Sequence, residues 1–244
     1  MNIPYWLSRT QLLLGDEATY NLMQKNVLVV GLGGVGGIAA EMIVRAGIGS
    51  ITIADADTVD LSNCNRQIPA LHSTVGLAKT TVMAQRLKDI NPELKVTVIN
   101  EWVKDELTYT LINDGNFDIA VDCIDTLTPK VTFIKACVDK GLPIISSLGA
   151  GGKLDATQVT ITDISHTHQC NLARYVRKKL HAMGIYKGVT CVYSPEAADQ
   201  SKIIVSEKAF PKKSLIGTIS YMPAVFGCFV ANAALNQLLV GNNE

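Results

Sequence analysis

The chain has 244 residues, of which 48% are hydrophobic and 18% are charged. This composition supplies enough apolar side chains for a sizeable core and excludes an intrinsically disordered protein. The formal net charge is zero, which excludes the overall basic field of a protein that binds nucleic acid indiscriminately and leaves such a role to a local basic patch.

Strands and helices alternate over the first 150 residues. Five buried strands are predicted, by "NVLVVG", "SITIAD", "KVTVIN", "FDIAVDCID" and "PIISSL". The segments between them predict helices, for example "GLAKTTVMAQRLKDIN", in which Met83, Leu87 and Ile90 recur at helical spacing. This alternation predicts an α/β fold with a doubly wound, mostly parallel Rossmann-like sheet.

The pattern changes after Gly149, where we expect antiparallel strands and added helices. Residues 170–184 predict an amphipathic helix with a basic face that carries Arg174, Arg177, Lys178 and His181. The segment "GVTCVYS" predicts a strand, and residues 196–214 predict a segment that is partly a surface loop. We expect residues 1–244 to form one domain, with an N-terminal helix, a core over 25–150 and an extension over 151–244.

Residues 214–243 carry no charge and are long enough to raise the question of a membrane span. Pro223 interrupts the run, and Asn232, Asn236 and Gln237 follow it, so we expect a fairly short core or dimer-interface helix instead. The N-terminus lacks the pattern of a signal peptide. Six cysteines without a C-x-x-C pair fit a reducing compartment, and we expect a cytoplasmic protein.

The segment "GLGGVG" at 31–36 follows a buried strand and opens a helix. In this context Gly31 allows the tight turn, Gly33 and Gly34 let a phosphate approach the backbone, and Gly36 permits close packing of the helix. Asp55 follows the next strand, where a carboxylate can accept a ribose hydroxyl. The pattern predicts an adenine nucleotide without saying which one.

Two cations and a second acid favour ATP over NAD. ATP carries more negative charge and reacts at a phosphate, so its sites add cations and a metal. Arg66 follows the loop after the second strand, and Lys79 falls in the first turn of the next helix. Asp125 ends the fourth strand, where a carboxylate suits Mg²⁺. Asp122 on the same strand is interpreted as structural.

Five motifs occur in order: "GLGGVG", "D-x-D-x-V", "S-N-x-x-R-Q", "VG-x-x-K" and "DC-x-D". Together they resemble the ubiquitin-activating-like adenylyltransferase superfamily, which has the ThiF/MoeB fold. The resemblance implies ATP-dependent adenylation of a carboxylate and places Asp125 on Mg²⁺. By motif position it also implies nucleotide contacts at Gly34, Asp55, Asn63, Arg66 and Lys79, and we add Asp57 and Gln67 to the predicted site.

An arginine near the N-terminus, Arg9 in "LSRTQLLLGDE", matches a family position that reaches the partner subunit's site, which implies a homodimer. The segments "LARYVRKKLHAMGIYKGVTCVYSPE" and "GTISYMPAVFGCFVA" resemble the tRNA threonylcarbamoyladenosine dehydratase branch, and the "QCN" before the first of them departs from its pattern. That branch implies a tRNA substrate. The basic face over 174–181, with Lys187 and Lys212–Lys213, is the candidate surface for tRNA.

The sequence also leaves two other functions open. One is an enzyme that activates the C-terminus of a sulfur-carrier protein, against which the missing zinc-binding C-x-x-C pairs argue. Another is an NAD-binding oxidoreductase, and a sulfur-relay protein is left open as a partner. The segment "HTHQC" at 166–170 carries three metal-ligand types but lacks a fourth ligand at zinc-like spacing, so we interpret it as a helix-entry loop without zinc.

Overall fold

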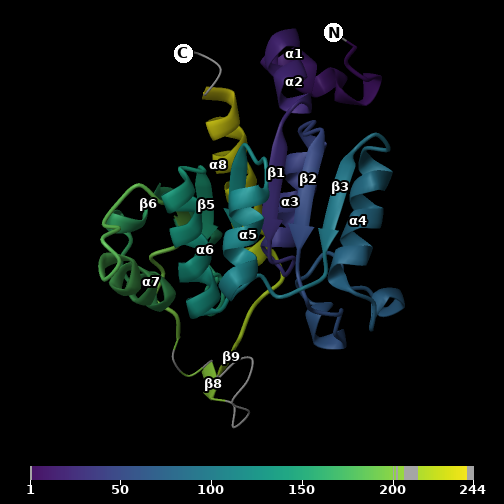
Figure 1. Ribbon diagram of the computed structural model, residues 1–244. Coiled ribbons are helices and arrows are strands. Elements are labelled where there is room, and N and C mark those ends of the chain that lie inside the picture. The colour runs from purple at the N-terminus through teal and green to yellow at the C-terminus, as the bar shows by residue number, and fades with distance from the viewer. Residues whose placement is uncertain (1, 200, 202, 206–213, 241–244) are drawn as a thin grey trace.

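Seven strands form one sheet in the order β3-β2-β1-β4-β5-β7-β6 (Figure 1). The computed structural model describes residues 2–199, 201, 203–205 and 214–240. Neighbours from β3 to β7 are parallel, and only β6 runs antiparallel, beside β7. The strands are β1 (Asn26–Val30), β2 (Ser50–Ala54), β3 (Lys95–Ile99), β4 (Ile119–Asp122), β5 (Ile144–Ser147), β6 (Thr160–Asp163) and β7 (Thr190–Tyr193). The predicted sheet, with its antiparallel C-terminal strand, is confirmed.

Helices cover both faces of the sheet. One face carries α5 (Asp105–Asp114), α6 (Leu127–Lys140) and α7 (Asn171–His181), and the other carries α3 (Gly36–Arg45), α4 (Lys79–Ile90) and α8 (Tyr221–Val240) (Figure 1). The helices α1 (Ser8–Leu14) and α2 (Asp16–Met23) lie beyond the amino ends of the strands. Short 3-10 turns are η1 (Tyr5–Leu7), η2 (Leu61–Asn63), η3 (His72–Thr74), η4 (Ala156–Gln158) and η5 (Ile164–His166).

The core consists of two apolar layers, one on each face of the sheet. Successive side chains of a strand point to opposite faces, and β1 follows this rule. Val27 and Val29 pack in the cluster beneath α3 and α8, whereas Leu28 and Val30 pack in the cluster beneath α6. All four are at most 4% exposed, which explains why this segment reads as a continuous hydrophobic run.

The uncharged C-terminal segment forms α8, a helix of 20 residues. The expectation of a core helix is confirmed, because Met222, Phe226 and Val230 are buried in the layer beneath it. The expected interruption at Pro223 and the expected short length of the helix are wrong. The proline lies in the first turn, where an N–H group would have no partner within the helix, so it does not break α8. The window that is apolar enough to span a membrane has a mean hydropathy of 1.5, and 44% of it is buried inside the protein.

Part of the segment expected to be a surface loop forms two short antiparallel strands. These are β8 (Ile203–Val205) and β9 (Ser214–Ile216), which pair with each other apart from the main sheet. They lie beyond the carboxyl ends of the parallel strands (Figure 1). Their pairing depends on each other rather than on a local pattern, which is why the sequence did not reveal it.

Candidate functional site

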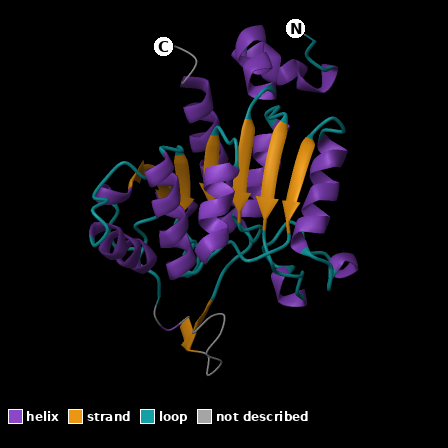
Figure 2. Cartoon of the chain, viewed as in Figure 1, coloured by secondary structure: helices purple, strands orange, loops and turns teal. Residues whose placement is uncertain are grey.

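The glycine turn lies between β1 and α3 at the carboxyl edge of the sheet, where the loops after the parallel strands gather (Figure 2). Gly31 has φ of +90°, and a Cβ atom there would lie 2.6 Å from the carbonyl oxygen of Cys123. A Cβ atom on Gly36 would lie only 1.7 Å from the Gly31 carbonyl oxygen. Both positions therefore require glycine, for the tight turn and the close helix packing that the sequence predicted.

The two glycines in the middle of the turn have different surroundings. A Cβ atom on Gly33 would meet nothing closer than Gln67 Nε2 at 3.9 Å. A Cβ atom on Gly34 would collide with Pro223 at 2.8 Å and would approach the carbonyl oxygen of Arg66 to 3.3 Å. Gly33 thus leaves room for a ligand, whereas Gly34 is also required because α8 packs against the turn. The sequence did not indicate this second reason for glycine.

Asp55 follows β2 and is tied to the glycine turn. Its Oδ2 accepts a hydrogen bond from the Leu32 N–H group at 2.6 Å, and its Oδ1 accepts one from the Asp57 N–H group at 2.8 Å. Burial raises the pKa of this carboxyl group, although the charge of Lys79 and the two N–H groups act in the opposite direction. The second lone pair on each oxygen can still accept a hydroxyl group of a ligand.

Lys79 begins α4, as expected, and its side chain is 5% exposed. The ammonium group of Lys79 lies 2.8 Å from Oδ2 of Asp57. The backbone N–H group of Lys79 also donates to the backbone carbonyl oxygen of Asp57, at 3.0 Å. Asp57 therefore fixes the lysine against the loop. An ammonium group has three donors, so this pair leaves Lys79 able to bind an anion as well.

The polar side chains between Asp60 and Arg66 organise their own loop. Asp60 and Asn63 form a reciprocal cap on η2, in which Asn63 Oδ1 accepts from the Asp60 N–H group at 3.2 Å. The guanidinium group of Arg66 donates to Ser62 O at 2.9 Å and to Asn65 Oδ1 at 2.8 Å. The nitrogen of the Asn65 amide donates to Thr218 O at 3.0 Å, so Asn65, to which the sequence assigned no role, links this loop to the segment before α8.

Gln67 carries a buried polar atom without a hydrogen-bond partner, its Oε1 atom. Its amide nitrogen, Nε2, is the nearest atom to the position that a Cβ atom on Gly33 would take, at an uncrowded 3.9 Å. A buried amide oxygen without a partner is costly. An amide group with an unpartnered oxygen, next to a glycine that has room for a neighbour, fits a site that is completed by a polar ligand such as a nucleotide.

Asp125 lies in the loop between β4 and α6, next to the glycine turn, because the carbonyl oxygen of Cys123 abuts Gly31. Asp122 is fully buried and accepts hydrogen bonds from Lys130 Nζ and Ser146 Oγ, each at 2.6 Å. The interpretation of Asp122 as structural is confirmed. Its partners could not be predicted from local patterns, because an isolated lysine in a helix resembles a surface residue.

Arg9 does not join this group within one chain. It lies in α1, beyond the amino ends of the strands, and is exposed. It lines a groove of about 460 Å³ that is otherwise formed mainly by α1, α2 and α8, among them Leu13, Leu22 and Leu239. Arg9 and the glycine turn of the same chain therefore lie at opposite ends of the strands, and the structure does not bring them together.

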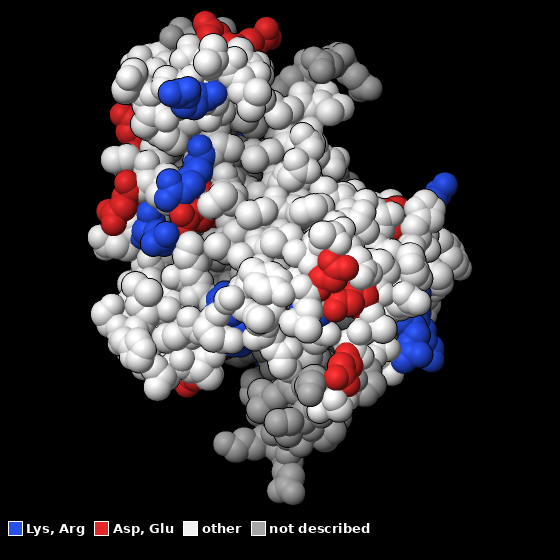
Figure 3. All heavy atoms as spheres, turned by 180° about the vertical axis from the view of Figure 1, so that it is seen from behind, with Lys and Arg blue, Asp and Glu red and all other residues white. Residues whose placement is uncertain are grey.

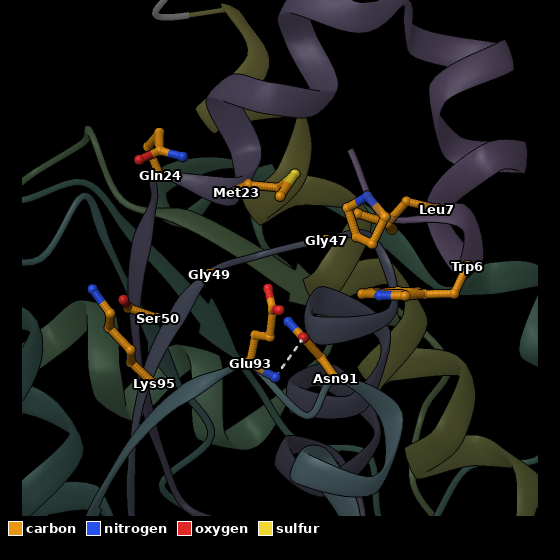
Figure 4. Close-up of a pocket in the computed structure, with 11 residues that line it drawn as sticks. Trp6, Leu7, Met23, Gln24, Gly47, Gly49, Ser50, Asn91, Glu93 and Lys95 are labelled. Carbon is orange, nitrogen blue, oxygen red and sulfur yellow. Dashed lines mark hydrogen bonds between the residues drawn. The ribbon is translucent and has the colours of Figure 1, made fainter. Parts of the chain in front are cut away.

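A second cavity, of about 240 Å³, also lies at the amino edge of β2 and β3 (Figure 4). Trp6 and Glu93 point into it, and Lys95 lies on its other side. Ligands of doubly wound sheets bind beyond the carboxyl ends of the strands. This cavity is therefore distinct from the nucleotide site, which is an open edge formed by backbone and loop side chains.

The segment 166–170 leads into α7, as interpreted. His168 Nδ1 and the hydroxyl group of Tyr193 lie 3.1 Å apart, and Cys170 is a buried residue at the start of the helix. Within the described ranges, no three His, Cys, Asp or Glu side chains gather in a way that could hold a metal ion. This observation does not bear on Mg²⁺ bound with a nucleotide, which takes only one or two carboxylates together with phosphate oxygens and water.

The basic helix α7 exposes Arg174, Lys178 and His181, as predicted. Arg177 differs, because its guanidinium group donates to the carbonyl oxygen of Thr167 at 2.6 Å and so holds the preceding loop. Lys212 and Lys213 lie outside the described residues. On the opposite face, which carries α3 and α8, the described Lys and Arg side chains lie scattered among acidic ones, without a basic stripe (Figure 3).

Comparison with known proteins identifies a family model, "ThiF family", that matches residues 7–244. The chain is 38% identical to the tRNA threonylcarbamoyladenosine dehydratase of Bacillus subtilis, over 95% of this chain and 94% of the relative. It is 37% identical to the Escherichia coli enzyme of the same name, over 94% of this chain and 92% of the relative. By contrast, the sulfur carrier protein ThiS adenylyltransferase of E. coli is 34% identical over 59% of each chain.

Solved structures agree with these sequences. The E. coli tRNA N6-threonylcarbamoyladenosine dehydratase, TcdA, in complex with ATP has a TM-score of 0.88 and 35% identity, covering 97% of this chain and 94% of that one. Its complex with AMP has a TM-score of 0.87 and 36% identity, covering 97% and 95%. E. coli MccB with ATP, at 19% identity and a TM-score of 0.63, shares the fold.

Proposed function

Because this chain belongs to the ThiF family, we propose that it catalyses the ATP-dependent dehydration of threonylcarbamoyladenosine in tRNA. The similarity to dehydratases extends over about 95% of the chain and includes the C-terminal extension, whereas the similarity to the ThiS adenylyltransferase covers 59%. The observation that supports the nucleotide site is the uncrowded backbone of Gly33, next to the Gln67 amide group, whose buried Oε1 atom has no hydrogen-bond partner.

The reaction we propose has two steps. An oxygen of the threonine carboxylate attacks the α-phosphorus of ATP, the bond to the β-phosphate breaks, and pyrophosphate leaves. The urea nitrogen of the same modified base then attacks the activated carbonyl carbon, loses its proton and expels AMP. The product is cyclic and has lost one water. Since both reacting groups belong to one substrate, proximity supplies much of the second step without an enzyme nucleophile.

The residues of the carboxyl edge have distinct roles in this proposal. The backbone around Gly33 and Gly34, at the start of α3, binds phosphate. Asp55 accepts the ribose hydroxyl groups, and Lys79 and Arg66 offset the charge that develops on the phosphates. For Arg66 this requires its guanidinium group to exchange its bond with the Asn65 side chain for the ligand. Asn63, Gln67 and Asp57 complete the pocket through the loop.

Mg²⁺ would be held by the carboxylate of Asp125, in the loop after β4, together with ATP phosphate oxygens, because Mg²⁺ commonly takes one or two carboxylates plus phosphate oxygens. When bound, the ion neutralises phosphate charge and orients the leaving group. An Asp125→Ala variant should keep the fold, because the side chain is exposed, but should lose activity. Full ATP–pyrophosphate exchange in that variant would contradict the metal assignment.

We propose a homodimer, and the position of Arg9 and the apolar surface beside it support this proposal. Leu12 and Leu13 on α1 are 81% and 82% exposed, and Leu61, Leu71 and Leu77 in the loops after β2 are also exposed. In an isologous dimer that pairs these two surfaces, Arg9 of one subunit enters its partner's site. Mixing Arg9→Ala with Asp125→Ala chains should then restore part of the activity, and no recovery would refute the assignment in trans.

The tRNA surface in this proposal is the exposed basic face of α7. Arg174, Lys178 and Lys187 would contact the phosphate backbone, whereas Arg177 is engaged by Thr167. The modified base must leave the stack to reach the crevice. A tRNA substrate also fits the expected cytoplasmic location. We propose in addition that residues 1–244 are one domain, since β6 and β7 of the extension join the same sheet as the nucleotide core.

Nucleoside mass spectrometry of tRNA incubated with the protein and ATP tests the proposal directly. Threonylcarbamoyladenosine should lose the mass of one water, with release of AMP and pyrophosphate. Pyrophosphate exchange that depends on a carrier protein and not on tRNA would support the sulfur-carrier alternative instead. Binding of NADH that ATP does not displace would support the oxidoreductase alternative.

A further inference from the structure

A fully buried ion pair lies beneath the predicted metal ligand. Lys130 Nζ in α6 lies 2.6 Å from Asp122 Oδ2 at the end of β4, and both side chains are 0% exposed. The same ammonium group donates to Ser147 O at 2.8 Å and lies 3.3 Å from Ser146 Oγ, both in β5. Its three donors thus have three acceptors, and the network joins α6 to the carboxyl ends of two strands.

Stability alone is a weak reason for such a pair. Removing two charges from water is costly, and apolar side chains of similar volume often stabilise a protein as well or better. What an ion pair does provide, when every donor and acceptor is satisfied, is a fixed geometry. This pair can therefore hold the backbone that contacts it in place.

The other carboxylate oxygen of Asp122 contacts the loop that carries Asp125. Asp122 Oδ1 accepts a hydrogen bond from the Ile124 N–H group at 3.0 Å. Ile124 lies between Cys123, whose carbonyl oxygen abuts Gly31, and Asp125. The buried pair therefore restrains the loop that carries Asp125 on one side and touches the phosphate-binding turn on the other.

We propose that Lys130 and Asp122 are positioning residues of the adenylation site, which hold residues 123–125 in the conformation that binds Mg²⁺ with ATP. This inference rests on the role proposed for Asp125. Lys130 acts from behind the loop, through the Asp122 carboxylate and the Ile124 N–H group. Its removal should weaken the use of Mg²⁺ more than the binding of the nucleotide itself.

The test compares Lys130→Met, which keeps an unbranched side chain that is one atom shorter and removes its charge, with the wild-type chain. ATP binding is titrated calorimetrically over a range of Mg²⁺ concentrations and again in EDTA, and Mn²⁺ binding in the presence of ATP is followed by electron paramagnetic resonance. We expect Lys130→Met to need about tenfold more Mg²⁺ or Mn²⁺ for half-saturation, equivalent to about 1.4 kcal/mol. ATP binding in EDTA should stay within about twofold of wild type, a small effect by the same conversion.

Glu41→Gln is the matched control. Glu41 is another buried carboxylate in an ion pair, 2.5 Å from Arg86, but it lies midway along α3, and it pairs with Arg45 and Arg86 rather than with the turn or the loop of Asp125. The control should lower the melting temperature without changing the Mg²⁺ titration. If Glu41→Gln shifts the metal titration as much as Lys130→Met does, the effect is general destabilisation and the proposal is wrong.

A second variant covers the case in which Lys130→Met does not fold. Asp122→Asn/Lys130→Met removes both charges together, so no uncompensated charge remains buried. A folded double variant should still require more Mg²⁺, and a titration identical to wild type would overturn the proposal. These titrations contain no tRNA, so a wild-type protein that binds Mg²⁺ with ATP but leaves tRNA unchanged would refute the proposed function alone.

Discussion

Replacing Gly33 by alanine separates the binding of the nucleotide from the stability of the turn. A Cβ atom at this position has no neighbour closer than Gln67 Nε2 at 3.9 Å, and Gly33 does not have a positive φ. The folded protein can therefore accept the methyl group without strain. Because alanine reduces the conformational freedom of the unfolded chain, the free energy of unfolding should stay equal or rise by about 0.4–1 kcal/mol.

The same methyl group should interfere with ATP. It occupies the space through which a phosphate would approach the backbone N–H groups of the turn. Losing one hydrogen bond to a charged group costs about 1.5–3 kcal/mol, which corresponds to a loss of affinity of about 10- to 150-fold. Isothermal calorimetry with ATP and urea unfolding of the same preparation measure the two quantities.

Gly36→Ala provides the contrast. Its Cβ atom would lie 1.7 Å from the Gly31 carbonyl oxygen, and no side-chain rotation can relieve a collision with backbone. This variant should lose stability and ATP binding together. If Gly33→Ala binds ATP as tightly as the wild-type chain, the nucleotide does not approach at Gly33 and the assignment of the turn is refuted.

Three further predictions follow from packing and charge. Glu41→Gln should lose stability at neutral pH, because burial raises the pKa of the Glu41 carboxyl group but Arg86 and Arg45 together lower it below its ordinary value. The stabilising contribution is present above about pH 4.5 and disappears as the pH falls through the lowered pKa. Urea titrations of the two proteins should therefore converge in acid. Gly227→Ala should destabilise the protein by about 1–3 kcal/mol, because its Cβ atom would lie 2.7 Å from that of Ile38 where α8 crosses α3, and an unchanged melting curve would contradict this packing. Iodoacetamide should modify the exposed Cys228 first, which peptide mass spectrometry can show. Cys123 and Cys191 should be protected, because burial raises the pKa of each thiol to about 12.

Local patterns were sufficient where a residue's role depends on its own strand or turn. The glycine turn, Asp55 and Lys79 were predictable because a buried strand that enters a helix fixes where its first few residues lie. The alternation of strands and helices likewise determined the doubly wound sheet. In each case the relevant neighbours lie within one strand-turn-helix unit.

Other features depend on segments that are distant in the sequence. Gly34 must be glycine because Pro223 of α8 packs on it, and the charge of Lys130 is buried because Asp122 and the end of β5 surround it. The position of Arg9, far from its own glycine turn, also depends on tertiary structure, because α1 packs beyond the amino ends of the strands.

The sequence by itself therefore determined the class of fold, the nucleotide turn and the chemistry that its motifs resemble. Only the tertiary structure decided which charges are neutralised by a partner, which glycines face a ligand and which face a helix, and on which edge each candidate residue lies. The physical reason is that periodicity and turn chemistry act over a few residues, whereas burial and charge pairing depend on contacts between segments that may lie more than a hundred residues apart, as Gly34 and Pro223 do.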